Sequence, residues 1–172
     1  MKPNWRKEER GMNHTHTIAA ALMAVSISTG AQASHHQDRH NHSHAGFSAG
    51  EPGDPAKPAR VIQVTMREAD GKMVFMPEQV AVKRGEQVRF VLRNVGELEH
   101  EFILATTAEN LKHAEAMRKN PDMEHDDPNG KRLAPTKTGE ILWKFSKAGE
   151  FEYSCLIPGH REGGMVGKVV VK

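Results

Sequence analysis

Hydrophobic and polar residues alternate with a period of two along most of the chain after residue 60. In the first such segment Ile62, Val64 and Met66 share one face, and polar residues separate them. This alternation is typical of β-strands with one buried face. It recurs at Val88, Phe90 and Leu92, at Ile141, Trp143 and Phe145, at Phe151, Tyr153 and Cys155, and at Val169 and Val171. The roughly 113 residues from Arg60 onward suffice for one β-sandwich of seven or eight strands around a single core.

Residues 106 to 138 interrupt this alternation. Thr107 is a suitable N-cap for a helix from about Ala108 to Lys119, and one side of that helix would carry apolar residues. These residues are Leu111, Ala114 and Met117. The helix is followed by proline, glycine and aspartate residues that favour loops. We therefore predict an all-β sandwich with a helix-containing insertion, at about 106–138, before the last strands.

The first 33 residues have the pattern of a secretory signal peptide. Basic residues precede the apolar run from Ile18 to Ile27, and Ala31-Gln32-Ala33 is a small-residue cleavage site. That run is too short to cross a bilayer, so we expect a cleaved leader, a periplasmic protein and no membrane span. A start at Met12 would leave a more ordinary leader. Its removal leaves acidic and basic residues balanced, which excludes the basic footprint of a nucleic-acid-binding protein.

Residues 34–59 are predicted to be a histidine-rich tail and linker. After cleavage the chain would begin Ser34-His35-His36, and an amine, two amides and the imidazole of His36 can offer square-planar ligands to Cu(II) or Ni(II). His40, His42 and His44 follow. Such tracts are compositional signals for metal binding, although a solvated tail without an ordered site is the alternative. Glycine and proline residues between 46 and 57 favour a flexible linker, so the folded domain is expected to span 60–172.

The only cysteine lies in a short loop that also carries a histidine and a methionine. Cys155, His160 and Met165 are each separated by four residues, and proline and glycine lie between them. With a second imidazole, for which His100 is the candidate, they would form a His2Cys trigonal site with a weak axial methionine, the arrangement that suits copper. The alternatives are a small buried cysteine in a strand and a surface histidine.

These residues resemble those of cupredoxins, the plastocyanin and azurin family. The resemblance covers roughly residues 60 to 172 and includes Asn94, Gly96 and His100 upstream of the Cys155 loop, and the closing segment from Gly167 to Val171. It implies a Greek-key β-sandwich that binds one type 1 copper ion. By this resemblance His100 and His160 are the imidazole ligands, Cys155 is the thiolate and Met165 is the axial thioether. Glu101 departs from the family, which often has asparagine or serine beside the first histidine.

The insertion contains further residues that bind soft metals. His113 and Met117 share a helix face, and Met123 and His125 follow. Together they are candidates for a secondary copper site, as is His36. The alternative, which we favour, is that Met117 packs the helix onto the sandwich while His113 and His125 are solvated.

Two functions are compatible with these features. A one-copper electron carrier would use only the four main ligands, whose loop has an apolar rim of Leu156, Ile157, Pro158 and Val166 interrupted by Arg161 and Glu162. A copper-handling protein would also use the tail and the insertion, and the chain is similar to periplasmic copper-tolerance cupredoxins, which combine such features. We favour copper tolerance, with electron transfer as the alternative.

No catalytic set is apparent in the sequence. Glu99 and Glu101 flank His100 but are expected to point away from it, because neighbouring residues of a strand face opposite sides. We therefore expect a protein that is not an enzyme and is a monomer. Its partners would be copper ions and a periplasmic or membrane redox or copper-transfer protein.

Overall fold

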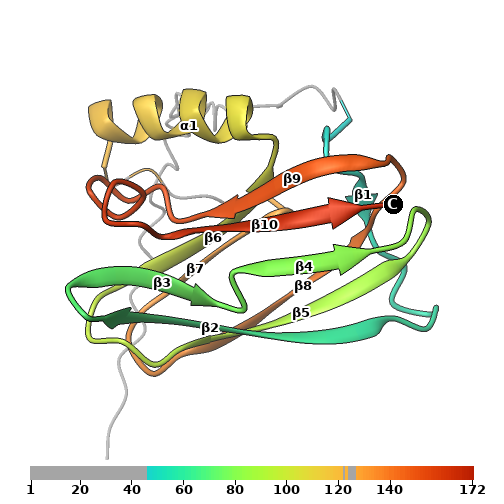
Figure 1. Cartoon of the computed structure of the whole chain (residues 1–172), viewed down its shortest axis with the longest axis horizontal. Coiled ribbons are helices and arrows are strands. Elements are labelled where there is room, and N and C mark those ends of the chain that lie inside the picture. Colours follow the sequence, from blue (N-terminus) through green and yellow to red (C-terminus); the bar gives the residue numbers. More distant parts are fainter. Residues whose placement is uncertain (1–45, 122, 124–126) are drawn as a thin grey trace, which may run out of the picture. The chain divides into compact units, whose positions relative to one another are not determined.

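The computed structural model describes residues 46–172 except 122 and 124–126, and these residues form two packed β-sheets (Figure 1). One sheet has the order β1 (Glu51–Pro52), β8 (Thr138–Lys144), β5 (Gln87–Asn94), β2 (Arg60–Ala69) and β3 (Lys72–Met76). The other has the order β4 (Gln79–Val82), β10 (Val166–Val171), β9 (Gly149–Ser154), β6 (His100–Ala105) and β7 (Gly130–Leu133). The predicted β-sandwich is therefore confirmed.

The chain passes repeatedly from one sheet to the other. β2 pairs with β5 and β4 pairs with β10 in parallel, whereas the other neighbouring strands are antiparallel. Parallel neighbours cannot be joined by a tight hairpin, so the chain must cross over between them. These crossings bring β6, from the middle of the chain, beside β9, from near its end.

The predicted alternation places the inward-facing residues in one core. Val64 and Met66 of β2, and Phe90 of β5, are fully buried there. Aromatic rings fill the space between the sheets: the ring of Phe102 is stacked on that of Tyr153 with centroids 5.0 Å apart. Removing this apolar surface from water is the main favourable contribution to folding.

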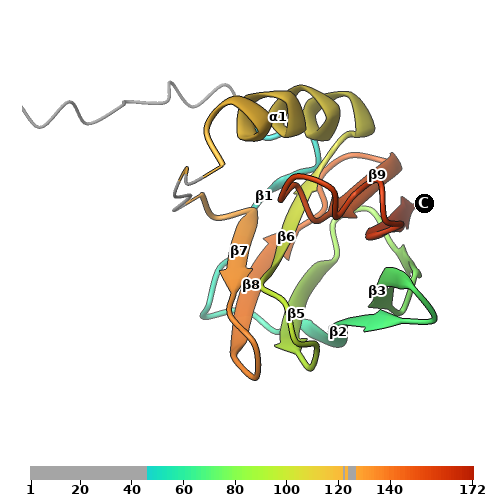
Figure 2. The same cartoon turned by 90° about the vertical axis from the view of Figure 1, so that its left-hand side faces the viewer.

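The helix of the insertion, α1 (Thr107–Lys119), lies on the outer side of the sheet that contains β6 and β9 (Figure 2). Its N-cap is Thr106, not Thr107: the Thr106 hydroxyl accepts the amide of Glu109, whose carboxylate accepts the Thr106 amide. A capping box needs glutamate or glutamine three positions after the N-cap, and Thr106 has Glu109 there whereas Thr107 has Asn110.

The buried face of α1 also differs from the prediction. Ala114 and Met117 are buried as expected, but Leu111 is 53% exposed and Asn110 is fully buried in its place. The Asn110 side-chain amide donates to the carboxylate of Glu152, 3.1 Å away. A polar partner in the sheet therefore favours burial of Asn110 at the position expected for Leu111, while the rest of the buried face is as predicted.

Two segments that we predicted to be loops belong to the sandwich. The end of the insertion forms β7, in which Leu133 pairs with His100 of β6. Upstream of residue 60, Ala49 is fully buried, its carbonyl accepts the indole N–H of Trp143 at 3.1 Å, and β1 pairs with β8. Neither segment is long enough to show a period of two in its sequence. Only the pairing with a neighbouring strand identifies each of them as a strand.

The predicted signal peptide at 1–33, and His36 with the rest of the predicted tail to residue 45, lie outside the described residues. Within the part that is described, no helix has the length and apolar character needed to cross a membrane.

Candidate metal centre

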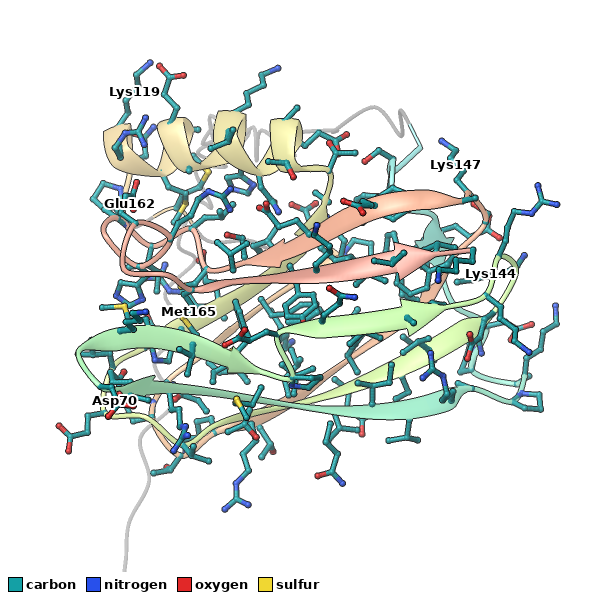
Figure 3. The ribbon with its side chains drawn as sticks, viewed as in Figure 1. Asp70, Lys119, Lys144, Lys147, Glu162 and Met165 are labelled. Atoms are coloured by element: carbon teal, nitrogen blue, oxygen red, sulfur yellow. The ribbon has the colours of Figure 1, made fainter. Side chains whose placement is uncertain are left out.

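The four predicted ligands come from two segments at one end of the sandwich. His100 begins β6, Cys155 directly follows β9, and the loop from Cys155 to Met165 leads into β10. Figure 3 shows Met165 and Glu162 at the same end as Asp70 of the β2–β3 turn, whereas Lys144 and Lys147 lie at the other end. Antiparallel pairing of β6 with β9 brings the start of one strand beside the end of the other.

Three of these side chains converge on one buried point. One donor atom each of His100, Cys155 and His160 lie within 4.8 Å of one another. The Nδ1 atom of His160 is 3.2 Å from Nδ1 of His100 and 3.3 Å from the sulfur of Cys155. Two imidazole nitrogens and a thiol sulfur directed at one point are the trigonal donor set that copper prefers.

In the metal-free protein, burial determines whether these three side chains carry a proton. It raises the pKa of the Cys155 thiol to about 12, although the amides of Glu101 and Ile157 oppose this effect. It also lowers the pKa of His100, against the opposing contact with Glu68, and that of His160. The metal-free site at neutral pH therefore holds a thiol and two neutral imidazoles, because burial disfavours every charged form.

The ligand loop is held by its own backbone. The amide of Cys155 donates to the carbonyl of Met165, and the amide of Met165 donates to the carbonyl of His160, both at 3.1 Å. Gly159 and Gly164 have φ angles of 89° and 100°, which L-residues with a side chain rarely adopt. These turns place Met165, fully buried, on the same loop as Cys155 and His160.

The outer side of this loop packs under helix α1. Leu156, which we predicted to lie in an exposed rim, is buried in a small cluster with Ile103, Ala114 and Met117. Leu156 is buried because it faces the opposite side of the chain from Cys155, and α1 covers that side. Ile157 and Val166 are half-buried and Pro158 is exposed, so the rim is smaller than predicted.

The predicted secondary ligands are only partly brought together. Met117 is fully buried in the apolar cluster under α1 and Met123 packs against it, so the predicted packing of Met117 is confirmed. His113 is half-buried and lines a cavity of about 190 Å³ with Phe47 and Asn110. His125 lies outside the described residues.

Glu101, which directly follows His100, is buried. Its side chain is 1% exposed, and its nearest cation, Arg132, is 3.8 Å away. Burial raises the pKa of this carboxyl group more than Arg132 lowers it. The backbone of Glu101 has a second role, since its amide lies 3.3 Å from the sulfur of Cys155 and donates to it.

The contacts of two charged side chains near the centre, Glu68 and Arg161, were not predicted from the sequence. The carboxylate of Glu68 lies 2.8 Å from Nε2 of His100. Arg161, next to His160, forms an ion pair with the buried Glu152 and donates to the Ser154 hydroxyl at 2.8 Å. For Glu68 a signal was present: it occupies the next inward position of β2 after Val64 and Met66, where a carboxylate requires a partner.

Proteins described as copper-resistant cuproproteins are similar to this chain. A protein of Rubrivivax gelatinosus described as "Copper-resistant cuproprotein CopI" is 49% identical over 161 residues, covering 90% of this chain and 95% of the relative. A protein of Pseudomonas aeruginosa with the same description is 35% identical over 156 residues, covering 74% and 84%. The structure of auracyanin B matches with a TM-score of 0.58 and 22% identity, over 72% of this chain and 96% of that one, which shows a common fold.

A protein-family model also matches most of the sequence. The family model described as copper binding proteins of the plastocyanin/azurin family matches residues 62–172, which include most of β2, all of β3 through β10 and all four predicted ligands. This match covers more than half of the chain and agrees with the donor set in the structure. The chain therefore belongs to the plastocyanin/azurin family of copper-binding proteins.

Proposed function

We propose that this protein is a periplasmic copper-binding protein of copper tolerance. One copper ion would be held by Nδ1 of His100 and His160, the thiolate of Cys155 and, axially, the thioether of Met165. The observation that carries this proposal is the convergence of two imidazole nitrogens and the only sulfur of a cysteine within 4.8 Å. The tolerance role is supported by relatives described as copper-resistant cuproproteins, of which one aligns over 95% of its length.

The donor set suits a centre that accepts both oxidation states of copper. A bound copper ion would supply reversible one-electron redox chemistry, because soft and nitrogen ligands in a fixed trigonal arrangement suit Cu(I) and Cu(II) alike. The chain contributes the geometry: β6 and β9 fix His100 and Cys155, and the backbone bonds of the loop fix His160 and Met165. Burial keeps water from the sulfur, whose residue is fully buried.

A Cu(II) titration of the mature chain from Ser34 tests the site and the role together. We expect the thiolate-to-copper absorption band to saturate at one copper per chain, with further copper bound outside this centre. The variant Cys155→Ser is expected to lose the band and keep the additional binding. A band that persists in Cys155→Ser contradicts the ligand assignment, and binding that stops at one copper favours the electron carrier.

Growth on copper then separates the two roles in the host. The deletion should remove residues 34–45 and stop there. Ala49 is part of the core, so a longer deletion would disturb folding. If the tail participates in copper tolerance, cells with this deletion grow less well on copper while the purified protein keeps its absorption band. Unchanged growth would favour an electron carrier with no role for the tail. We expect no catalytic turnover from the purified protein in either case.

A further inference from the structure

The carboxylate of Glu68 touches His100, one of the four main predicted copper ligands. Its Oε1 atom lies 2.8 Å from Nε2 of His100, on the opposite side of the imidazole ring from the metal centre. His100 is fully buried, whereas the Glu68 side chain is 32% exposed, so the carboxylate extends inward from the surface to the ring. This contact lies outside the four ligands.

The orientation of this carboxylate is fixed by the loop before His100. The amide of Glu97 donates to Oε2 of Glu68 at 2.9 Å, and the amide of Leu98 donates to Oε1 at 3.2 Å. A Cβ atom on Gly96 would lie only 2.4 Å from a carboxylate oxygen, so the absence of a side chain at Gly96 makes room for Glu68. The carboxylate is thus built into its position, and its bond to His100 does not depend on a mobile surface side chain.

Glu68 is not the only side chain that holds the loop before His100 in its conformation. Asn94 accepts the amide of Gly96 at 2.9 Å and donates to the carbonyls of Leu98 and Leu133 at 2.7 and 2.9 Å. Asn94 therefore braces the same turn from the other side. This second brace makes the effect of Glu68 on His100 separable from its effect on the loop.

The contact determines which nitrogen of His100 carries the proton. A carboxylate that already accepts two amides is an acceptor, so Nε2 of His100 must be the donor. A neutral imidazole carries one N–H, so Nδ1 then keeps its lone pair, and Nδ1 is the atom that faces His160 and Cys155. Carboxylate partners of this kind orient ligating histidines and raise their basicity.

We propose that Glu68 is a positioning residue of the metal centre, which holds His100 in the Nε2–H tautomer and places a negative charge behind the ligand. The assignment of a metal to this centre rests on the function proposed above, whereas the tautomer is a property of the metal-free protein. The negative charge stabilises the more positive Cu(II) over Cu(I), so Glu68 also lowers the reduction potential of the bound copper.

Three variants distinguish this role from general effects. Glu68→Gln keeps an acceptor oxygen and removes the charge, and Glu68→Ala removes both. Glu97→Gln is the matched control, since it removes a carboxylate from the same turn while the bond from the Glu97 backbone amide to Glu68 remains. Thermal unfolding and amide spectra verify that each variant folds.

The first measurement uses long-range ¹H–¹⁵N correlation spectra of the imidazoles in the metal-free protein. We expect His100 as a single Nε2–H tautomer in the wild type and in Glu97→Gln, and a mixture in Glu68→Ala. An unchanged tautomer in a folded Glu68→Ala would overturn the proposal. If no copper bound the wild type, the proposed function would fail, but this measurement would still decide the tautomer.

The second measurement uses the copper-loaded protein. We expect Glu68→Gln to raise the reduction potential and to keep the thiolate absorption band, and Glu68→Ala to weaken copper binding by about 10- to 100-fold. Glu97→Gln should change neither. An equal rise in potential for Glu97→Gln and Glu68→Gln would mean that only the surface charge matters, and would reject a specific role for the contact with His100.

Discussion

The sulfur of Cys155 accepts a hydrogen bond from the backbone amide of Glu101, with the two atoms 3.3 Å apart. Glu101 directly follows His100, so one stretch of backbone in β6 fixes both the first imidazole and the donor to the sulfur. An amide that donates to sulfur favours the thiolate over the thiol and opposes the effect of burial. The two ligand segments are therefore linked before any metal binds.

Copper binding is expected to release one proton from the centre near pH 7. In the metal-free protein burial raises the pKa of Cys155 to about 12, so its thiol is protonated and must lose its proton to bind copper. The imidazoles are already neutral there, because burial lowers the pKa of both histidines. Copper affinity should consequently rise about tenfold per pH unit around neutrality.

Calorimetric titrations in two buffers with different ionisation enthalpies count these protons. Cys155→Ser is the control, since it keeps the tail while the proton from the thiol disappears. Below the pKa of the histidines more than one proton should be released, and the dependence on pH should become steeper. Equal proton release by the wild type and Cys155→Ser would contradict the predicted protonation.

Glu101→Gln should change how the stability of the metal-free protein depends on pH. Burial raises the pKa of Glu101 in the folded state above its ordinary value of 4.5. Below pH 4.5 the group is protonated in both states, and its contribution to stability is fully present. As the pH rises through the folded pKa this contribution is lost, because the buried carboxylate is charged only at a cost in free energy.

The test compares the free energy of unfolding of wild type and Glu101→Gln by urea denaturation from pH 4 to pH 8. The variant should gain stability relative to the wild type as the pH rises, and Glu97→Gln, at an exposed position nearby, serves as the control. A difference between variant and wild type that does not depend on pH would show that the carboxyl group titrates normally.

Met117→Ala is expected to destabilise the protein by about 2–5 kcal/mol, because it leaves a cavity between α1 and the ligand loop. Met117 is fully buried beside Leu156, which follows Cys155. Met117→Leu conserves volume and should cost less than about 1.5 kcal/mol. Leu111→Ala, on the exposed face of the same helix, should change stability by less than about 0.5 kcal/mol.

Chemical denaturation measures these differences, and copper titration adds a second readout. If Met117 acts only in packing, Met117→Leu binds as much copper as the wild type. A loss of bound copper in the folded Met117→Leu would instead support the secondary site in the insertion.

Gly167→Ala should destabilise the protein by about 1–3 kcal/mol through overpacking. Gly167 of β10 is paired with Tyr153 of β9, and a Cβ atom at this position would lie 2.0 Å from the Tyr153 ring. Because Tyr153 lies two residues before Cys155, its displacement should also alter the thiolate absorption band. Gly46→Ala is the control, since a Cβ atom there meets nothing within 4 Å.

Thermal unfolding and the visible spectrum of the copper-loaded variant test this prediction. A band unchanged in position, despite lower stability, would mean that β9 holds Cys155 independently of Tyr153.

Local patterns predicted the strands and the ligands well. Period-two alternation identified the buried faces of β2, β5, β8, β9 and β10, because each strand has apolar residues at every second position. The spacing of Cys155, His160 and Met165, with the resemblance to cupredoxins, identified the loop and led to His100. The structure brings His100, Cys155 and His160 together, while the axial role of Met165 stays a prediction.

The missed features depend on partners that are distant in sequence. β7 is only four residues long, and it is a strand because β6 offers it a hydrogen-bonding edge. Leu156 is buried because α1 covers it, and Asn110 replaces Leu111 inside because Glu152 accepts its amide. Each of these partners is too distant in the sequence to affect the local pattern of apolar and polar residues from which a strand or helix is predicted.

The sequence by itself determined the strand faces, the capped helix and the types of the metal-binding atoms, because these follow from the properties of residues close together in the chain. Only the tertiary structure decided which nitrogens face the centre, that Glu101 lies buried beside it, and that Glu68 lies behind His100. Thirty-two positions separate Glu68 from His100. The parallel pairing of β2 with β5, which leads into the turn before His100, brings them together, and a contact made by packing cannot be read from local order.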